Sequence, residues 1–286
     1  MSGGRAGALD GDLRLLVCDL DGTLLEADGS ISDRTRSALG GVRAAGIRVV
    51  VATGRIPKGI LSLVRELDLD GPQITMHGAL VTAPTNGETV FASTLGPEQV
   101  DELLALAAEI DLPVLLCYPG GFRTNDLRQE VVDLFVPFNE PLPELVEDLA
   151  ALRASRPNKI AIWTGKERYQ AALDAARRRL GDRYTITSGD NRSIELLPRG
   201  VDKGRAAGEL ARWMGLSLEQ VGAIGDGTND IELLSAAHRS VAMRHARPEV
   251  QAAADLVVPD GVPDDAASAI AVLFDGRQPF GKGATS

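Results

Sequence analysis

Short apolar segments alternate with amphipathic segments at both ends of this sequence, and this alternation limits the possible folds more than any other feature. Residues 13–20 (LRLLVCDL) and 47–54 (IRVVVATG) are typical of buried strands, and Leu15 to Cys18 show no polar alternation. Residues 32–46 between them have helical periodicity, with Ser32 or Asp33 as the N-cap. A second helix is expected from Pro57, followed by a single strand over 72–81. Strands that alternate with helices predict right-handed βαβ units and a parallel sheet.

The middle of the chain has a different pattern. A hairpin is expected around residues 85–88 (TNGE), followed by a helix over 97–109 and a strand over 112–118. We therefore expect an α/β protein in which an α+β unit is inserted into a parallel-sheet core. The predicted division is a core of residues 13–82 and 190–275, an inserted cap domain of residues 83–189, and flexible tails at 1–12 and 276–286.

The composition excludes several classes of partner. A formal net charge of -10 argues against nucleic acid and anionic membranes, so an anionic substrate needs local attraction. No apolar run approaches the roughly 18 residues of a membrane span, and the N-terminus lacks the apolar region of a signal peptide, which predicts a cytoplasmic protein. Cys18 and Cys117 lie in apolar runs and are expected to be buried thiols. Trp163 and Trp213 are also expected in the core.

Two carboxylates end the first apolar strand. Burial of Asp19 and Asp21 is costly unless something compensates for their desolvation. They are two residues apart, so in an extended chain both point to one face, at the strand end where open α/β sheets bind ligands. Gly22 allows a sharp turn that presents its N–H to an anion.

Other strand and helix ends supply complementary groups. Thr53 follows the second strand and supplies a hydroxyl, and Gly54 beside it allows close approach of the backbone. Asp226 ends a later strand, and Asp230 follows one helical turn further on, where a simple interaction with the helix dipole is an alternative role for it. Lys203 begins another predicted helix.

A Mg²⁺ ion gives this set of groups one explanation. Asp19 and Asp226, with a backbone carbonyl, are hard oxygen ligands that suit Mg²⁺. The cation offsets the burial of the carboxylates and their repulsion of a phosphate. Lys203, Thr53 and the Gly22 amide are then expected to bind the phosphoryl oxygens.

The expected reaction follows from the spacing of the two aspartates. With its oxygen held at the metal, Asp19 is predicted to attack phosphorus in line and form an aspartyl phosphate. Asp21 is predicted to protonate the leaving alcohol and afterwards to deprotonate the attacking water.

Four segments carry these groups in order: DLDGTLL (19–25), ATGR (52–55), VDKG (201–204) and GDGTNDIELL (225–234). In order and spacing they resemble the four motifs of the haloacid dehalogenase superfamily of phosphatases. The inserted unit resembles the large C2 cap of the Cof-type subfamily, and the similarity extends from about residue 13 to residue 274.

The resemblance implies a Mg²⁺-dependent phosphomonoesterase with a Rossmann-like core and a mobile cap that selects a small phosphorylated metabolite. By motif match, the resemblance implies that Asp19 is the nucleophile and that Asp21 is the acid/base and also gives its carbonyl to the metal. It implies phosphate binding by Thr53 and Lys203 and a position facing the phosphate for Asn229. It also implies that Asp226 is a metal ligand and that Asp230 supports the metal site.

The sequence departs from the family pattern at positions expected near the mouth of the site. His77 stands where members usually carry Asn, and Arg244 and His245 stand where they usually carry a Gly-Asn pair. The loop at 257–268 lacks an Asn common near that point. His77 and Arg55 are candidates for contact with substrate, and a hydrogen-bonded structural role for His77 remains an alternative.

Three other functions use similar groups. A phosphomutase on a hexose phosphate returns the phosphoryl group to a sugar, a signalling receiver keeps the phosphoaspartate without needing an inserted domain, and a phosphosugar-binding protein performs no turnover. A phosphatase is favoured because all four motifs keep their reactive groups. The sequence specifies neither the leaving group nor the oligomeric state.

Overall fold

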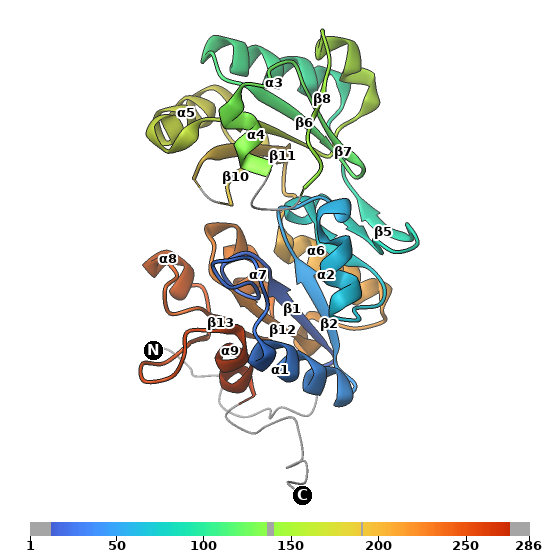
Figure 1. Cartoon of the computed structure of the whole chain (residues 1–286), viewed down its shortest axis with the longest axis vertical. Helices are drawn as coiled ribbons and strands as arrows, with labels where there is room; N and C mark the ends of the chain where they lie inside the picture. Colours follow the sequence, from blue (N-terminus) through green and yellow to red (C-terminus); the bar gives the residue numbers. More distant parts are fainter. Residues whose placement is uncertain (1–12, 136–139, 190, 275–286) are drawn as a thin grey trace, which may run out of the picture.

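Two β-sheets organise this computed structural model, which describes residues 13–135, 140–189 and 191–274. Figure 1 shows two lobes, and the segments from both ends of the chain share the lower one. We call the lower lobe the core and the upper lobe, formed by the middle of the chain, the cap. The predicted tails, residues 1–12 and 276–286, lie outside the described residues.

In the described part of the chain, the core sheet has eight strands. Their spatial order is β14 (Leu256–Val257), β13 (Arg239–Ala242), β12 (Val221–Gly225), β1 (Leu15–Asp19), β2 (Arg48–Ala52), β3 (Gln73–Thr75), β4 (Leu80–Thr82) and β5 (Thr89–Ala92). The strands from β14 to β3 are parallel, as the alternation of strands and helices predicts. β4 and β5 add an antiparallel edge.

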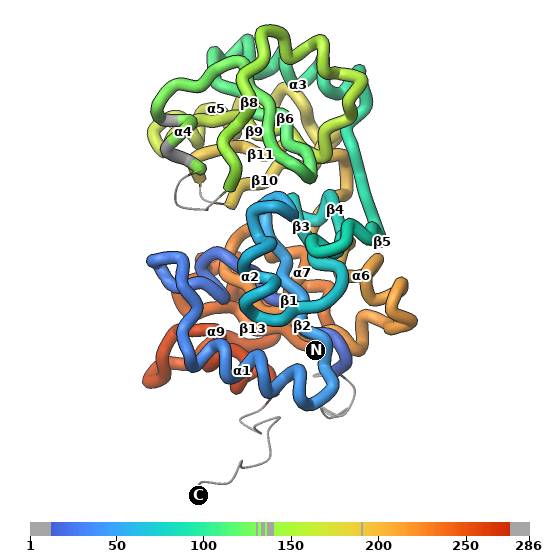
Figure 2. The backbone as a smooth tube through the Cα atoms, turned by 45° about the vertical axis from the view of Figure 1, so that its right-hand side comes forward, coloured from blue at the N-terminus to red at the C-terminus, as the bar shows by residue number. Residues whose placement is uncertain are grey.

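Helices cover both faces of the core sheet (Figures 1 and 2). One face packs against α1 (Asp33–Ala44), α2 (Leu61–Glu66) and α9 (Ala266–Leu273). The other packs against α6 (Lys203–Trp213), α7 (Ile231–Ala236) and α8 (Pro248–Gln251). Because both faces are covered, β1 and β2 are apolar almost throughout.

Within the described ranges, the cap sheet has six strands. Their spatial order is β10 (Tyr184–Thr187), β11 (Ser193–Pro198), β9 (Lys159–Trp163), β6 (Val114–Tyr118), β7 (Gly121–Thr124) and β8 (Glu144–Leu145). The helices α3 (Pro97–Glu109) and α5 (Gly165–Leu180) cover its outer face, and α4 (Gln129–Phe135) lies near its inner face. The 3-10 segment Ala150–Ser155 contacts α3.

The alternation of side chains along the cap strands divides them between the two faces. In β9, Ile160 and Ile162 pack with the outer helices, so Lys159 and Ala161 lie on the face turned toward the core. Glu195 pairs directly with Ala161 across β11 and β9 and therefore shares that face. The inner face of the cap thus carries charged as well as apolar side chains.

Several expected elements are confirmed and two need correction. The helix over residues 97–109 is present, and Ser32 caps α1 by accepting from the Thr35 N–H. The single strand predicted over 72–81 is wrong, because a turn at Met76–Gly78 divides it into β3 and β4. The helix predicted from Pro57 begins as a 3-10 segment, Pro57–Ile60, before α2.

The burial expected for the tryptophans is only partly correct. Trp213 is 50% exposed because it ends α6, beyond the part of the helix that packs on the sheet. Trp163 is partly buried, beside the apolar cluster between cap and core. Both cysteines are buried and free, as expected.

Strand pairing suggests domain junctions different from the expected ones. β5 pairs with β4 in the core sheet, although the cap was expected to begin at residue 83. β11 pairs with β9 in the cap sheet, although the core was expected to resume at residue 190. We therefore propose junctions after β5 and after β11, because backbone hydrogen bonds bind each strand to its own sheet.

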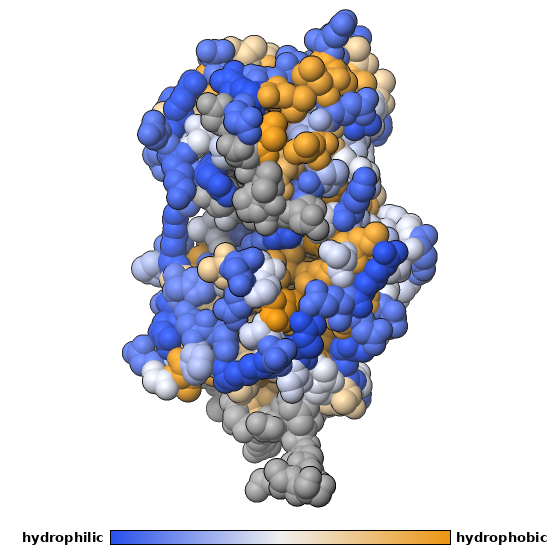
Figure 3. Space-filling model, viewed as in Figure 1, coloured by the Kyte–Doolittle hydropathy of each residue, from blue (hydrophilic) through white to orange (hydrophobic). Residues whose placement is uncertain are grey.

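One face of the molecule is shown in Figure 3. Hydrophilic residues predominate on the face seen in Figure 3, with apolar residues in smaller groups between them. No helix in the described ranges combines the length and apolar character needed to cross a bilayer.

Candidate active site

The carboxyl ends of β1, β2 and β12 lie side by side below the cap. β2 pairs with one side of β1 and β12 with the other. The order of the strands therefore reverses at β1, and such a switch point is where open α/β sheets bind ligands. Asp19 ends β1, Thr53 follows β2 and Asp226 follows β12. The sheet topology therefore brings together side chains from the first, second and fourth motifs.

Lys203, from the third motif, is fully buried beside two carboxylates. Its Nζ donates to Asp19 Oδ1 at 2.5 Å and to Asp230 Oδ1 at 2.6 Å. Burial lowers the pKa of Lys203, but the two aspartates outweigh burial and raise it overall, so the lysine stays charged. Burial and Asp230 raise the pKa of Asp19 well above its usual value, and Lys203 opposes this rise.

The Asp226 carboxylate is held by two neighbours. Thr23 Oγ1 donates to Asp226 Oδ1 at 2.8 Å. Gly22 has a φ of +90°, and a Cβ there would lie 2.5 Å from Asp226 Oδ2, so a larger residue would displace the carboxylate. His245 Nε2 lies 3.5 Å from Asp226 Oδ2, and its Nδ1 lies 2.8 Å from Asp264. Bonds to both aspartates raise the pKa of His245 to about 9.

The acidic cluster fits a divalent cation. One carboxylate oxygen from each of Asp19, Asp226 and Asp230 lies within 4.8 Å of the others. These are hard oxygen ligands, and Lys203 supplies one positive charge against three carboxylates. Asp230 already accepts from Lys203 and from the N–H groups of Asp226 and Gly227, at 3.1 and 2.9 Å. Asp19 and Asp226 are therefore the better-placed ligands.

Asp21 lies at the rim of this cluster, with its side chain 39% exposed. Arg55 Nε donates to Asp21 Oδ2 at 3.1 Å, and the guanidinium also bonds Asp21 Oδ1. Thr53 is 1% exposed, and its hydroxyl accepts from the Arg55 N–H at 3.2 Å. Arg55, a candidate for substrate contact in the sequence, is thus the partner of Asp21 in this structure.

His77 lies on a turn of unfavourable backbone conformation. Met76 and His77 have φ of 53° and 55°, values that side-chain-bearing residues adopt at a cost. The turn directs His77 over Gly54, where an added Cβ would lie 2.4 Å from Nε2. The Asn229 amide nitrogen lies 3.1 Å from His77 Nδ1. Burial lowers the pKa of His77, so its ring is neutral at pH 7.

The cap contributes buried charges that contact the core. Lys159 Nζ donates to Gly54 O at 2.8 Å and bonds Glu195. Glu195 Oε2 lies 3.2 Å from His77 Nε2. Burial raises the pKa of Glu195, but Lys159 and His77 outweigh burial and lower it overall, so this carboxylate is charged. Glu140 Oε1 accepts from the Ile56 N–H at 2.8 Å.

Five residues of the site were not predicted from the sequence: Thr23, Lys159, Glu195, Glu140 and Asp264. Lys159 and Glu195 had a usable signal, because each is a charged residue inside a strand that is otherwise apolar. The same signal identified Asp19 in β1. Glu140 and Asp264 lie in irregular segments, where no periodicity marks an inward-facing position.

Glu140 should make stability depend on pH. Its partial removal from water raises its pKa to about 7, against the opposing effects of the Ile56 N–H, Lys159 and Arg55. Because the folded pKa exceeds the unfolded value of 4.5, the stabilisation is complete below pH 4.5 and is lost as pH rises through about 7. Relative to Glu140→Gln, the wild-type protein should lose unfolding free energy over this interval.

Denaturant titrations of both proteins at several pH values test this prediction, since the difference between them cancels the other titrating groups. Glu147→Gln, at an exposed cap position, is the matched control and should follow the wild type. Parallel curves for wild type and Glu140→Gln would contradict the prediction.

In a doubly wound sheet, ligands bind at the carboxyl ends of the strands beside the switch point, and this is where the acidic cluster lies, under a lobe inserted in the chain. A family model described as haloacid dehalogenase-like hydrolase matches residues 16–269. The chain belongs to this family, and the Cof-type resemblance of its motifs is confirmed.

Known proteins similar to the chain include phosphatases. A putative phosphatase of Streptococcus pyogenes serotype M6 is 28% identical over 84% of this chain and 90% of its own length. The HMP-PP phosphatase of Klebsiella pneumoniae is 28% identical over 84% of this chain and 87% of its own length. The chain also matches a chloroplastic endoribonuclease YBEY of Arabidopsis thaliana at 27% identity over 89% of this chain, but spans only 45% of that protein.

Solved structures agree on the fold. A haloacid dehalogenase-like hydrolase from Bacteroides thetaiotaomicron superposes with a TM-score of 0.79 at 27% identity, over 92% of this chain and all of that one. A sugar phosphatase of HAD subclass IIB superposes with a TM-score of 0.74 at 26% identity, over 86% of this chain and 93% of that one. The α/β fold and the phosphatase class expected from the motifs are confirmed.

Proposed function

We propose that this protein is a Mg²⁺-dependent phosphatase that hydrolyses a small phosphomonoester through an aspartyl phosphate at Asp19. The observation that carries the proposal is the buried contact of Asp19 with Lys203, next to Asp226 at the end of the adjacent strand. Phosphatase relatives, including the sugar phosphatase and the HMP-PP phosphatases, support a small phosphorylated metabolite as substrate.

Asp19 and Asp226 would hold the cation, with the Asp21 carbonyl as a further ligand, while Asp230 fixes the loop that carries Asp226. When bound, Mg²⁺ neutralises charge on the phosphoryl oxygens. Lys203 and Thr53 would bind the remaining phosphoryl oxygens, together with the backbone amides near Gly22 and Gly54. Asn229 would face the phosphate from the fourth motif.

In the first step, an Asp19 carboxylate oxygen attacks phosphorus and the bond from phosphorus to the ester oxygen breaks. Asp21 gives a proton to the leaving alkoxide, so an alcohol departs. In the second step, Asp21 removes a proton from water, which attacks phosphorus and breaks the bond to Asp19. Inorganic phosphate leaves and both aspartates return to their starting state.

The different positions of Asp21 and Asp19 support this division of roles. The guanidinium holds the Asp21 carboxylate at the rim, away from the buried pair formed by Asp19 and Lys203. A carboxylate at the rim can exchange protons with an alcohol or with water, because it is accessible to both. A buried carboxylate is shielded from water and can act as a nucleophile.

Removal of divalent cations should lower kcat/KM for p-nitrophenyl phosphate by about 10³-fold, since a Lewis acid supplies several kcal/mol of transition-state stabilisation. Turnover measured after chelation and after adding back Mg²⁺ tests this expectation. Acid quenching with substrate labelled at phosphorus should trap label on the protein. Equal turnover in chelator and in Mg²⁺ would refute the proposed cofactor, and an isomerised sugar phosphate without free phosphate would indicate a mutase.

A further inference from the structure

We propose that Lys159 and Glu140 of the cap are positioning residues for phosphoryl transfer. They hold the loop of residues 53–56, which we call the β2 loop, in the conformation that presents Thr53 and Gly54 to a phosphate. The inference rests on the proposed phosphatase function and deepens it by adding residues that act on the phosphate through the backbone. The phosphate-binding side of the site is then complete only when the cap is seated on the core.

The β2 loop connects β2 to the 3-10 segment that precedes α2, and it has no regular secondary structure. Its backbone groups therefore need partners outside a helix or a sheet. The core supplies some of them, since N–H groups of the turn at Met76–Gly78 donate to Thr53 O and Arg55 O, at 2.9 Å each. Gly54 O and the Ile56 N–H have their partners in the cap.

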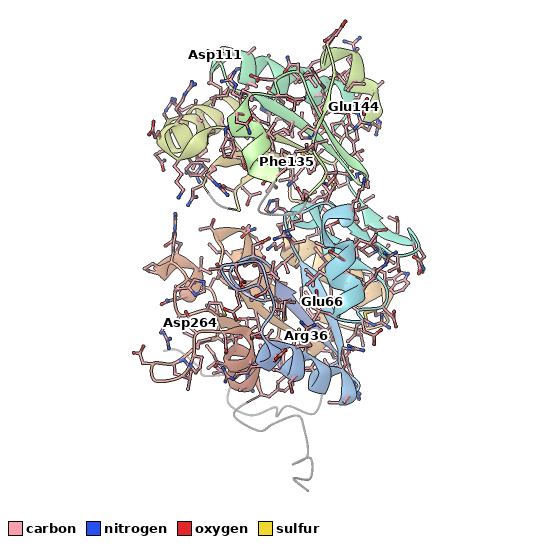
Figure 4. All side chains as sticks on the ribbon, in the orientation of Figure 1. Arg36, Glu66, Asp111, Phe135, Glu144 and Asp264 are labelled. Carbon is pink, nitrogen blue, oxygen red and sulfur yellow. The ribbon has the colours of Figure 1, made fainter. Side chains whose placement is uncertain are left out.

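Two side chains of the cap bond these two backbone groups. Lys159 Nζ donates to Gly54 O at 2.8 Å, and Glu140 Oε1 accepts from the Ile56 N–H at 2.8 Å. The Glu140 N–H donates to Phe135 O at 3.4 Å, and Figure 4 labels Phe135 at the underside of the cap, the side that faces the core. The β2 loop is therefore bonded to the other lobe at two points.

Lys159 is itself held in place by the cap sheet. It is 5% exposed on β9, and its Nζ also bonds Glu195 of the neighbouring strand β11. Burial lowers the pKa of Lys159, but Glu195 outweighs burial and raises it overall, so the lysine stays charged. Because two strands of one sheet hold this charge, the position of Gly54 O depends on the position of the cap.

Apolar packing also makes the β2 loop depend on the cap. Ile56 of the loop and Met76 of the adjoining turn are fully buried in a cluster that also contains Leu115 and Phe122 of the cap. Met76 has a φ of 53°, a conformation that persists only where the surrounding structure enforces it. Separation of the lobes would expose these apolar side chains and free the turn that donates to the β2 loop.

The β2 loop carries two groups of the proposed phosphate site. Thr53 Oγ1 accepts from the Arg55 N–H at 3.2 Å across Gly54, so movement of the Gly54 backbone also moves the hydroxyl. A misplacement of about 1 Å in such a group can lower a rate by about 100-fold. Lys159 and Glu140 thus influence the reaction although each reaches the phosphate site only through backbone atoms of the loop.

Binding of orthovanadate, which has no leaving group, tests the proposal. Glu195→Gln is expected to keep the bond from Lys159 to Gly54 O. The double variant Lys159→Met/Glu195→Gln lacks that bond and leaves no unpaired carboxylate at position 195. With Mg²⁺ present, the double variant should bind orthovanadate about 10-fold or more weakly than Glu195→Gln. Inhibition constants and isothermal titration calorimetry measure this affinity.

The dependence on the leaving group separates positioning from substrate contact. Lys159 also lines the cavity above Asp19, so a direct contact with the leaving group is the competing explanation. A positioning role lowers kcat/KM of the double variant, relative to Glu195→Gln, by a similar factor for p-nitrophenyl phosphate and for every other ester that the wild type hydrolyses. Lys166→Met, at an exposed cap position, is the control and should change neither kcat/KM nor the affinity for orthovanadate.

A second pair of variants tests the other cap contact and replaces the first pair if the double variant does not fold. Glu140→Gln keeps an oxygen that can accept from the Ile56 N–H, whereas Glu140→Leu removes it. Glu140→Leu should therefore bind orthovanadate about 10-fold more weakly than Glu140→Gln, with a similar fall in kcat/KM for every ester.

Equal affinity for orthovanadate within both pairs of variants would overturn the inference and leave the phosphatase function standing. A loss of kcat/KM confined to one ester would also overturn it, because that result assigns the side chain to the leaving group. Failure of the wild type to hydrolyse every ester, including p-nitrophenyl phosphate, would refute the phosphatase function itself.

Discussion

Asp19→Asn is expected to reduce kcat for any phosphomonoester by about 10⁴-fold or more, the scale on which removal of a nucleophile acts. The amide keeps the shape of the side chain, but it cannot form the bond to phosphorus. The same variant should retain no label after acid quenching with substrate labelled at phosphorus. Steady-state kinetics and intact-protein mass spectrometry measure the two effects.

The folding stability of Asp19→Asn should not fall in the absence of divalent cations. Burial and Asp230 raise the pKa of Asp19, which indicates that its negative charge is unfavourable in this cluster. A neutral amide removes that charge, and Lys203 keeps Asp230 as a partner. Asp70→Asn, at an exposed position, is the matched control. An active Asp19→Asn, or an inactive one that is unfolded, would contradict the prediction.

Lys203→Met is expected to lose both activity and stability. The methionine leaves the Asp19 and Asp230 carboxylates buried without their shared cation. Removal of one partner of a buried ion pair typically costs about 3–5 kcal/mol, so the unfolding free energy measured in chelator should fall by that amount. Phosphate also loses a positive contact, so kcat/KM measured with Mg²⁺ should fall by about 10³-fold.

Lys166→Met is the matched control for Lys203→Met, because Lys166 is exposed in the cap. It should change neither the denaturation midpoint nor the rate. A Lys203→Met protein as stable as the wild type in chelator would show that the two carboxylates do not need the lysine. That outcome would remove the electrostatic argument for the cluster.

The two variants test different parts of one arrangement. Asp19→Asn removes a reacting atom from a cluster that tolerates the loss of charge, whereas Lys203→Met removes the charge that the cluster needs. Loss of activity with unchanged stability in the first, and loss of both in the second, would distinguish the nucleophile from the group that positions it. Equal effects of the two on stability would argue for a purely structural cluster.

Local sequence was sufficient for most of the core and for part of the cap. The apolar runs around Leu15 and Val49 predict β1 and β2, because residues buried on both faces leave a continuous apolar run. The hairpin expected around residues 85–88 connects β4 to β5. The short strands β7, β8 and β14 were not predicted, since too few residues are available to show a period.

The sequence also predicted that residues from different motifs lie close together in the site. Because parallel strands present their carboxyl ends at one edge, Asp19 and Asp226 had to meet once β1 and β12 were strands of one sheet. Arg55 and Asp21 were both identified as candidates, but the contact between them was not predicted. A side-chain rotamer decides that contact, and sequence spacing does not determine it.

By itself, the sequence determined the α/β core, the family and the acidic cluster, because periodicity and glycine turns act locally and strand order is limited to few topologies. Only the tertiary structure decided what covers that cluster. Lys159, Glu195 and Phe122 lie far along the chain from Asp19, and their inward direction depends on strand register and on how the cap rests on the core. Contacts between two different sheets leave no period in the sequence, so the residues that line the cavity above Asp19 could be found only in three dimensions.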